Sequence, residues 1–161
     1  MVLLAISVTP ALAGLKWADV GVNGLTCSMC SRSVEMSLRR LDFVDNIAMS
    51  LETTEARIFF KTNAPIDLNE IAKAVVNAGF SVRFLKLQIS FDDIPLTADG
   101  SFVFHDQKFK WIDFQKPINE PVVLKLVEQN FLPKKERSQW KEKTSTSTTG
   151  DERILHVVQH G

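Results

Sequence analysis

Two cysteines, Cys27 and Cys30, are the residues of this chain whose type and spacing could do chemistry. With two residues between them, both sulfur atoms can face one point at a turn that leads into a helix. The free N–H groups at the start of a helix favour a thiolate over a thiol, and this predicts a lowered pKa for Cys30 in the first turn. Two thiolates suit soft ions such as Cu(I) and Hg(II), or Zn(II) with additional ligands. The pair is therefore the predicted metal site, and two-coordinate Cu(I) fits it best.

The same pair has other chemical interpretations. It could form a disulfide, or a redox centre of the thioredoxin kind, because CxxC at a helix start also serves that chemistry. Here Ser28 and Met29 separate the cysteines, in place of the Gly-Pro that is typical of thioredoxin-like proteins. A structural zinc site needs four ligands, and the sequence has no second cysteine pair. The thioether of Met29 could be a third ligand, but packing or contact with a partner explains it better.

Other polar and aromatic side chains are explained better without a site. His156 and His160 lie in a strand-like pattern, in which residues four apart are ~13 Å apart, so we do not expect them to share a metal. Three arginines after the cysteines could dock a partner, but a solvated helix face accounts for them; they are Arg32, Arg39 and Arg40. The aromatic residues of the second half are predicted to form a core; they are Phe102, Phe104, Trp111 and Phe114.

Composition excludes several classes of protein. The 161 residues are 45% hydrophobic and 24% charged, which is typical of a soluble globular protein. Nineteen basic residues balance nineteen acidic ones, so no net positive field attracts nucleic acid. No glycine-rich phosphate loop, Ser-His-Asp arrangement or carboxylate cluster with metal-ligand spacing is present, and we therefore do not expect an enzyme.

A strand and a helix are predicted on either side of the cysteines. Apolar residues alternate with polar ones from Ala18 to Val22, which indicates a half-buried strand. After Cys30, the apolar side chains Val34, Leu38 and Leu41 recur at helical spacing. The cysteines are thus predicted to lie in the connection between this strand and this helix.

Four more elements are predicted up to Phe84. Two strands, around 47–51 and 56–60, form a hairpin, and a second helix follows with a capping box at Asp67 and Glu70. Gly79 ends that helix, and a strand begins at Phe80. The order βαββαβ is that of the ferredoxin-like sandwich, with four antiparallel strands and two helices on one face. The fold class is therefore predicted to be α+β.

The last of these strands changes its pattern, and this predicts a domain junction. Its apolar residues switch from one parity to the other between Phe84 and Leu85, which requires a bulge or a new packing partner. We expect residues 14–90 to be one domain and residues 91–161 a small β-rich module. In that module, strand patterns indicate a hairpin around 102–112 and two later strands, with a short helix over 133–143 and a Ser/Thr-rich linker from Thr144 to Gly150.

Gly24 to Cys30, at the predicted turn between strand and helix, resembles the G-M-T-C-x-x-C signature of the heavy-metal-associated domains. Leu25 takes the place of Met, and Ala78-Gly79-Phe80 is similar to a later motif of the family. The resemblance covers residues 15–84 and leaves the C-terminal half unassigned. It implies that Cys27 and Cys30 hold an ion on an exposed loop and pass it on by ligand exchange. Such domains occur in copper chaperones, copper pumps and periplasmic mercury-binding proteins.

The first 13 residues are predicted to be a cleaved signal peptide. They form a short apolar run that ends in Ala11-Leu12-Ala13, a pattern that signal peptidase accepts, although a buried first strand is the alternative. The run is too short to span a bilayer, which needs ~20 residues. A periplasmic or extracytoplasmic protein without a stable membrane span is therefore expected.

Together with the resemblance, these features predict an exported protein that captures Cu(I) through Cys27 and Cys30 and exchanges it with a donor or acceptor. A transport ATPase or another metal-binding domain would be such a partner. Two alternatives keep the same pair of cysteines: a periplasmic mercury-binding protein, and a redox or metal-sensing head coupled to the β-rich module.

Overall fold

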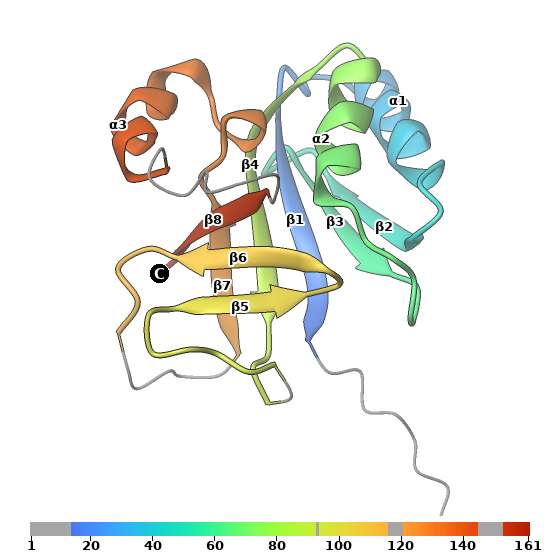
Figure 1. Cartoon of the computed structure of the whole chain (residues 1–161). Helices are drawn as coiled ribbons and strands as arrows, with labels where there is room; N and C mark the ends of the chain where they lie inside the picture. Colours follow the sequence, from blue (N-terminus) through green and yellow to red (C-terminus); the bar gives the residue numbers. More distant parts are fainter. Residues whose placement is uncertain (1–13, 93, 116–120, 145–152) are drawn as a thin grey trace, which may run out of the picture.

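The computed structural model describes residues 14–92, 94–115, 121–144 and 153–161, and the predicted signal peptide lies outside them. In this part of the chain, eight strands form one sheet in the order β2-β3-β1-β4-β7-β8-β6-β5. Helices α1 and α2 lie side by side, and α3 lies apart from them across the sheet (Figure 1). No described helix combines the length and the apolar character needed to cross a membrane.

The first six elements confirm the predicted βαββαβ order. Strand β1 pairs antiparallel with both β3 and β4, and β3 pairs with β2, which gives the sheet of a ferredoxin-like fold. Their bounds are β1 Leu15–Asn23, α1 Ser28–Arg39, β2 Val44–Ser50, β3 Glu55–Phe60, α2 Leu68–Asn77 and β4 Ser81–Ile89.

Helix α2 begins and ends at the predicted residues, with one difference. Asp67 is its N-cap, but the carboxylate accepts the N–H of Asn69 at 2.9 Å, and Glu70 binds Lys73 at 2.6 Å in place of closing a capping box. Gly79 adopts a φ of 91°, which a residue with a side chain rarely does, and this ends the helix.

A bulge explains the change of parity in β4. Gly21 is opposite Phe84 and Val22 is opposite Val82, so Arg83 is an extra residue on this strand. After the bulge the strand stays in the same sheet, and its residues Lys86–Ile89 pair with β7. The sheet therefore runs through the predicted junction, and the division into residues 14–90 and 91–161 stays a prediction.

The second half extends the sheet beyond β4. Strands β5 and β6 form the predicted hairpin, and its tip residues His105 and Asp106 have φ values of 45° and 59°, as in a tight hairpin turn. Strand β8 pairs with β7 antiparallel and with β6 parallel. The bounds are β5 Ser101–Phe104, β6 Gln107–Trp111, β7 Val122–Leu126, the 3-10 helix η1 Gln129–Phe131, α3 Lys134–Thr144 and β8 Ile154–Gln159.

Helix α3 is held to the sheet by polar contacts. It has no buried residue, and its Trp140 is only half-buried. The ammonium of Lys125 in β7 binds Glu136 at 2.9 Å, and Arg137 donates to the carbonyl of Leu132 at 3.1 Å. Of the predicted linker, Thr144 ends α3, and residues 145–150 lie outside the described ones.

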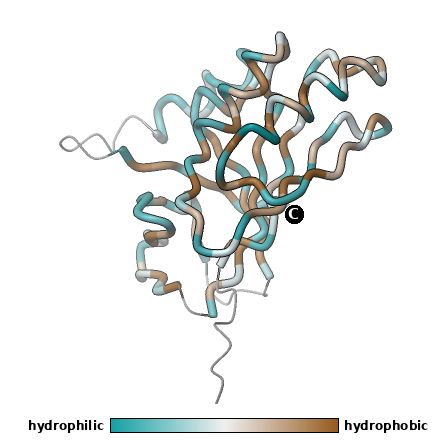
Figure 2. Tube along the Cα trace, turned by 90° about the vertical axis from the view of Figure 1, so that its right-hand side faces the viewer, coloured by the Kyte–Doolittle hydropathy of each residue, from teal (hydrophilic) through white to brown (hydrophobic). Residues whose placement is uncertain are grey.

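One continuous core joins the two halves. Leu85, Leu87 and Ile89 of β4 are fully buried in it, together with apolar side chains from α1, α2 and β7. The β5–β6 hairpin, which crosses in front of β4 and β7 in Figure 1, adds Phe102 and Phe109, whose rings stack at 4.9 Å. Hydrophobic and hydrophilic residues alternate along the elements that enclose this core (Figure 2).

The predicted aromatic core of the second half is confirmed in part. Phe102 and Trp111 are buried, whereas Phe104 and Phe114 are half-buried and pack against the edge of the core. The ring of Phe104 also lies so close to Gly14 that a Cβ atom there would be 2.3 Å from it. The end of β5 therefore meets the start of β1, and the sheet curls back on itself.

Because the halves share a sheet and a core, we expect them to unfold together. Variants that keep only Trp17 or only Trp111 should report the same denaturant midpoint by fluorescence. Leu87→Ala should lower the free energy of unfolding by about 2–5 kcal/mol, and the half-exposed Val103→Ala by no more than about 0.5 kcal/mol. Two separate transitions would contradict a single cooperative unit.

Candidate metal centre

One buried side chain anchors the loop between β1 and α1, and the tip of the loop is exposed to solvent. Gly24 has a φ of 85°, which turns the chain out of β1, and Leu25 then enters the core with 3% of its surface exposed. Leu25 therefore fills the position of the family's Met, as the sequence predicts. Thr26 and Cys27 are exposed, and Met29 is 81% exposed. The apolar contact of one side chain thus anchors a loop whose polar and sulfur atoms face water.

Cys27 is the N-cap of α1. Its Sγ accepts the backbone N–H of Cys30 at 3.2 Å, and its carbonyl accepts the N–H of Ser31 at 3.0 Å. Cys30 lies in the first turn of α1, as the sequence predicts, and the lowered pKa of its thiol stays a prediction. The side chain that accepts a free N–H group here is that of Cys27, the residue before the first turn.

The structure brings the two predicted sulfur atoms together. Cys27 and Cys30 are joined by a disulfide, with their Cα atoms 5.2 Å apart. Cys27 is exposed, and Cys30 is half-buried against the core. This is the oxidised form of the pair, in which neither sulfur is a thiolate, so binding of an ion requires that the disulfide first be reduced.

A hollow of about 380 Å³ lies beside the cysteine loop. It is lined by Ser28, Met29, Ser31, Arg32, Glu35 and Leu51. Leu51 is 47% exposed and comes from the turn between β2 and β3, so two exposed apolar side chains, Met29 and Leu51, flank the hollow. The sequence pattern gave no signal for Leu51, because only the packing of the hairpin places it next to this loop.

The arginines of α1 differ in their surroundings. Arg39 binds Glu35 at 2.8 Å and reaches Asn46 at 3.5 Å, so its charge is balanced within the chain. Arg32 lines the hollow beside the cysteine loop, and Arg40 is exposed at the end of the helix. A solvated helix face therefore describes Arg39 and Arg40, whereas Arg32 belongs to the surroundings of the site.

The two C-terminal histidines do not form a shared site. His156 is buried in β8, with its Nδ1 atom 2.6 Å from a carboxylate oxygen of Glu128, and His160 follows the end of the strand. Across the ranges that the structure describes, no three His, Cys, Asp or Glu side chains gather as ligands. Cys27 and Cys30 therefore stay the predicted metal ligands.

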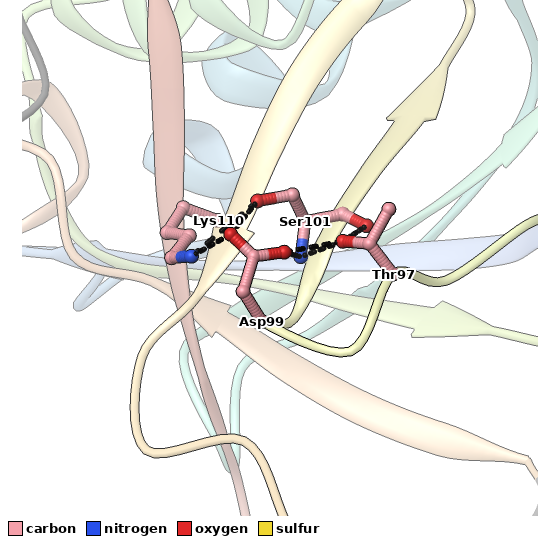
Figure 3. Close-up of polar contacts among 4 residues, drawn as sticks. All are labelled: Thr97, Asp99, Ser101 and Lys110. Atoms are coloured by element: carbon pink, nitrogen blue, oxygen red, sulfur yellow. Dashed lines mark hydrogen bonds and ion pairs between the residues drawn. The ribbon is translucent and has the colours of Figure 1, made fainter.

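A polar cluster far along the chain braces a loop (Figure 3). Lys110, Thr97 and the hydroxyl and N–H of Ser101 all donate to the carboxylate of Asp99. The hydrogen bond from Lys110, followed by those from Thr97 and Ser101, holds the pKa of Asp99 well below its usual range. Sequence analysis missed this cluster, although the Thr-x-Asp-x-Ser spacing is typical of such turns. Because its donors converge on Asp99, the cluster fastens the loop to β6.

The cysteine loop and its scaffold match known proteins. The model of the heavy-metal-associated domain matches residues 19–81. The periplasmic component of a mercuric transport protein from Pseudomonas fluorescens is 31% identical over 77 residues, which are 48% of this chain and 84% of that protein. The copper-transporting ATPase RAN1 from Arabidopsis thaliana is 34% identical over 74 residues, but these are 46% of this chain and only 7% of the ATPase.

Two solved structures are similar over the same share of the chain. Oxidized MerP from Ralstonia metallidurans CH34 is 27% identical, with a TM-score of 0.38, over 42% of this chain and 96% of MerP. A copper binding domain from HMA7, a P-type ATPase, is 31% identical, with a TM-score of 0.39, over 42% and 90% of the two chains. Strands β5 to β8 lie beyond the residues that the family model matches. The chain belongs to the heavy-metal-associated domain family, whose members bind and transfer metal ions.

Proposed function

We propose that this protein is an exported metal carrier that captures Cu(I) through Cys27 and Cys30 and passes it to another metal-binding protein. The observation that carries the proposal is the position of the two sulfur atoms, together on an exposed loop at the start of α1. Soft thiolates prefer soft ions, and two ligands from one loop satisfy an ion that accepts two-fold coordination.

Capture begins with reduction of the disulfide. A dithiol reductant supplies two electrons and two protons, the S–S bond breaks, and the reductant leaves as its own disulfide. Cys27 then has the backbone N–H of Cys30 as a donor to its sulfur, and this hydrogen bond stabilises a thiolate. Loss of the thiol protons frees the pair to bind Cu(I), the cargo.

Release to a partner needs an open side of the loop. Met29 and Leu51 flank the hollow beside the cysteines, so an approaching loop meets apolar surface and the cationic Arg32. An incoming thiolate can attach before a Cys27 or Cys30 thiolate leaves, because a two-coordinate ion has room for a third ligand. We propose as partner a metal-binding domain, such as that of a copper-transporting ATPase, and no catalytic role for this chain.

Export is the second part of the proposal. The apolar residues 1–13 end in a pattern that signal peptidase accepts, and the mercuric transport relative is a periplasmic component. A periplasmic location agrees with the disulfide, because disulfides form and persist in the oxidising periplasm. A reductant must then convert the disulfide of Cys27 and Cys30 back to two thiols before the protein can bind metal.

Hg(II) is the second candidate cargo. The mercuric transport relative is matched over 84% of its length, so the resemblance to it includes nearly the whole of that protein. Hg(II) also prefers two thiolates, and the same pair would serve it. The redox alternative keeps the disulfide of Cys27 and Cys30 as the functional group and would give the pair a reduction potential in the range of oxidoreductases.

Competition with chelators ranks these cargoes. We expect the fully reduced protein to bind one Cu(I) more tightly than Zn(II), and Cys27→Ser and Cys30→Ser each to weaken binding by at least about a hundredfold, since one thiolate remains. Met29→Leu is the matched control, because an exposed thioether outside the ligand set should leave Cu(I) affinity unchanged. Tighter binding of Hg(II) than of Cu(I) at equal chelator strength would assign the cargo to mercury, and equal affinity of both cysteine variants and the parent would overturn the site.

The N-cap predicts which thiol reacts first. In the Cys30→Ser variant, Cys27 still receives the backbone N–H of residue 30, whereas in the Cys27→Ser variant Cys30 has no such donor. We expect Cys27 to be alkylated by iodoacetamide several times faster than Cys30 at pH 7, measured by mass spectrometry in the two single-cysteine variants. Faster alkylation of Cys30 would mean that the cap does not govern reactivity in the reduced loop.

A further inference from the structure

The face of the sheet that α1 and α2 leave uncovered carries a row of charges. Side chains alternate along each strand, so the buried residues Ala18, Leu85 and Leu124 point into the core while their neighbours point the opposite way. The cross-strand register then aligns one residue from each of four strands. In the order β3, β1, β4, β7 they are Arg57, Asp19, Lys86 and Lys125.

The two ends of this row are balanced within the chain. Both carboxylate oxygens of Asp19 accept hydrogen bonds from Arg57 at 2.8 Å, and the guanidinium of Arg57 lies 3.9 Å from the centre of the Trp17 ring. At the other end, Lys125 binds Glu136 of α3 at 2.9 Å. Neither pair leaves a charge that needs an outside partner.

Lys86, in the middle of the row, has no such partner. Its ammonium lies 4.2 Å from the centre of the Phe84 ring, and no carboxylate among the described residues lies within 4.0 Å of it. Its direct neighbour on β7 is another lysine, Lys125, and like charges opposite each other across two strands destabilise a sheet. The row and Glu136 together therefore hold three positive and two negative charges, with the surplus at Lys86.

His160 lies near this position, because its backbone N–H donates to the carbonyl of Val123, two residues before Lys125 in β7, at 2.8 Å. Burial, followed by the nearby charges of Lys86 and Lys125, lowers the pKa of His160, and Glu55 opposes this weakly. Glu55 is itself 3.7 Å from Arg83, so it is not the missing partner of Lys86. At neutral pH the imidazole is uncharged and offers an N–H donor without adding to the positive charge.

We propose that Lys86, together with His160, binds a carboxylate of an acidic peptide segment on a partner protein. One negative charge balances the surplus, which fits a carboxylate better than a doubly charged phosphate. A nucleic acid or an anionic membrane needs several free cations, whereas the described residues of this row offer one. This surface is separate from the cysteine loop, and the proposal does not depend on metal transfer.

The probe is the blocked peptide acetyl-Gly-Glu-Gly-amide, followed by NMR of the 15N-labelled full chain at constant ionic strength. We expect saturable shifts at Phe84, Lys86 and His160 and a higher pKa of His160 in the complex, because the bound carboxylate offsets the field of Lys86. Lys86→Gln should weaken binding about tenfold or more, and Lys86→Arg, which keeps the charge, should retain it. Lys61→Gln, at an exposed lysine of another loop, is the matched control and should leave binding unchanged.

Three outcomes would overturn the proposal. Equal shifts with acetyl-Gly-Gln-Gly-amide would mean that the carboxylate is not recognised. Tighter binding of inorganic phosphate than of the glutamate peptide would assign the position to a different anion. Unchanged affinity in a Lys86→Gln variant that keeps the circular dichroism spectrum of the parent would remove Lys86 from the surface.

Discussion

The hydrogen bond from the N–H of Cys30 to the sulfur of Cys27 ties the chemistry of this protein to its fold. A helix start leaves N–H groups without partners, and Cys27 satisfies one of them with the same sulfur atom that we propose as a metal ligand. The position of the sulfur is therefore fixed by α1, which is fixed in turn by the core contacts of Val34 and Leu38. A helix packed on a sheet is what holds an exposed loop in a defined place.

The sheet supports α1 and the cysteine loop, and the second half of the chain adds strands to this sheet. In the predicted βαββαβ unit, β4 would be an edge strand, and exposed edges are prone to pairing with other chains. Here β7 pairs with β4, and the β5–β6 hairpin folds over the core that the first half begins. The second half therefore protects an edge and completes a core, and the face of the enlarged sheet that α1 and α2 leave uncovered carries the charged row through Lys86.

Sequence reasoning identified the elements and the pair of cysteines but not their local details. Helical and strand periodicity placed α1, α2 and the eight described strands correctly, because apolar spacing is set by which face is buried. It did not identify Cys27 as the N-cap of α1, since spacing alone does not tell which residue takes that position. It also read the parity change in β4 as a junction, although a bulge at Arg83 within one sheet explains it.

Local patterns by themselves determined the fold class and the loop that carries Cys27 and Cys30, and they predict the preference of that pair for soft ions. These depend on neighbours in the chain, on the periodicity of burial and on the chemistry of sulfur. Only the tertiary structure decided that Leu51 borders the cysteine loop, that both halves share one core and that Lys86 lies opposite Lys125. Each of these joins residues far apart in the sequence, and strand register and packing, which no local pattern specifies, bring them together.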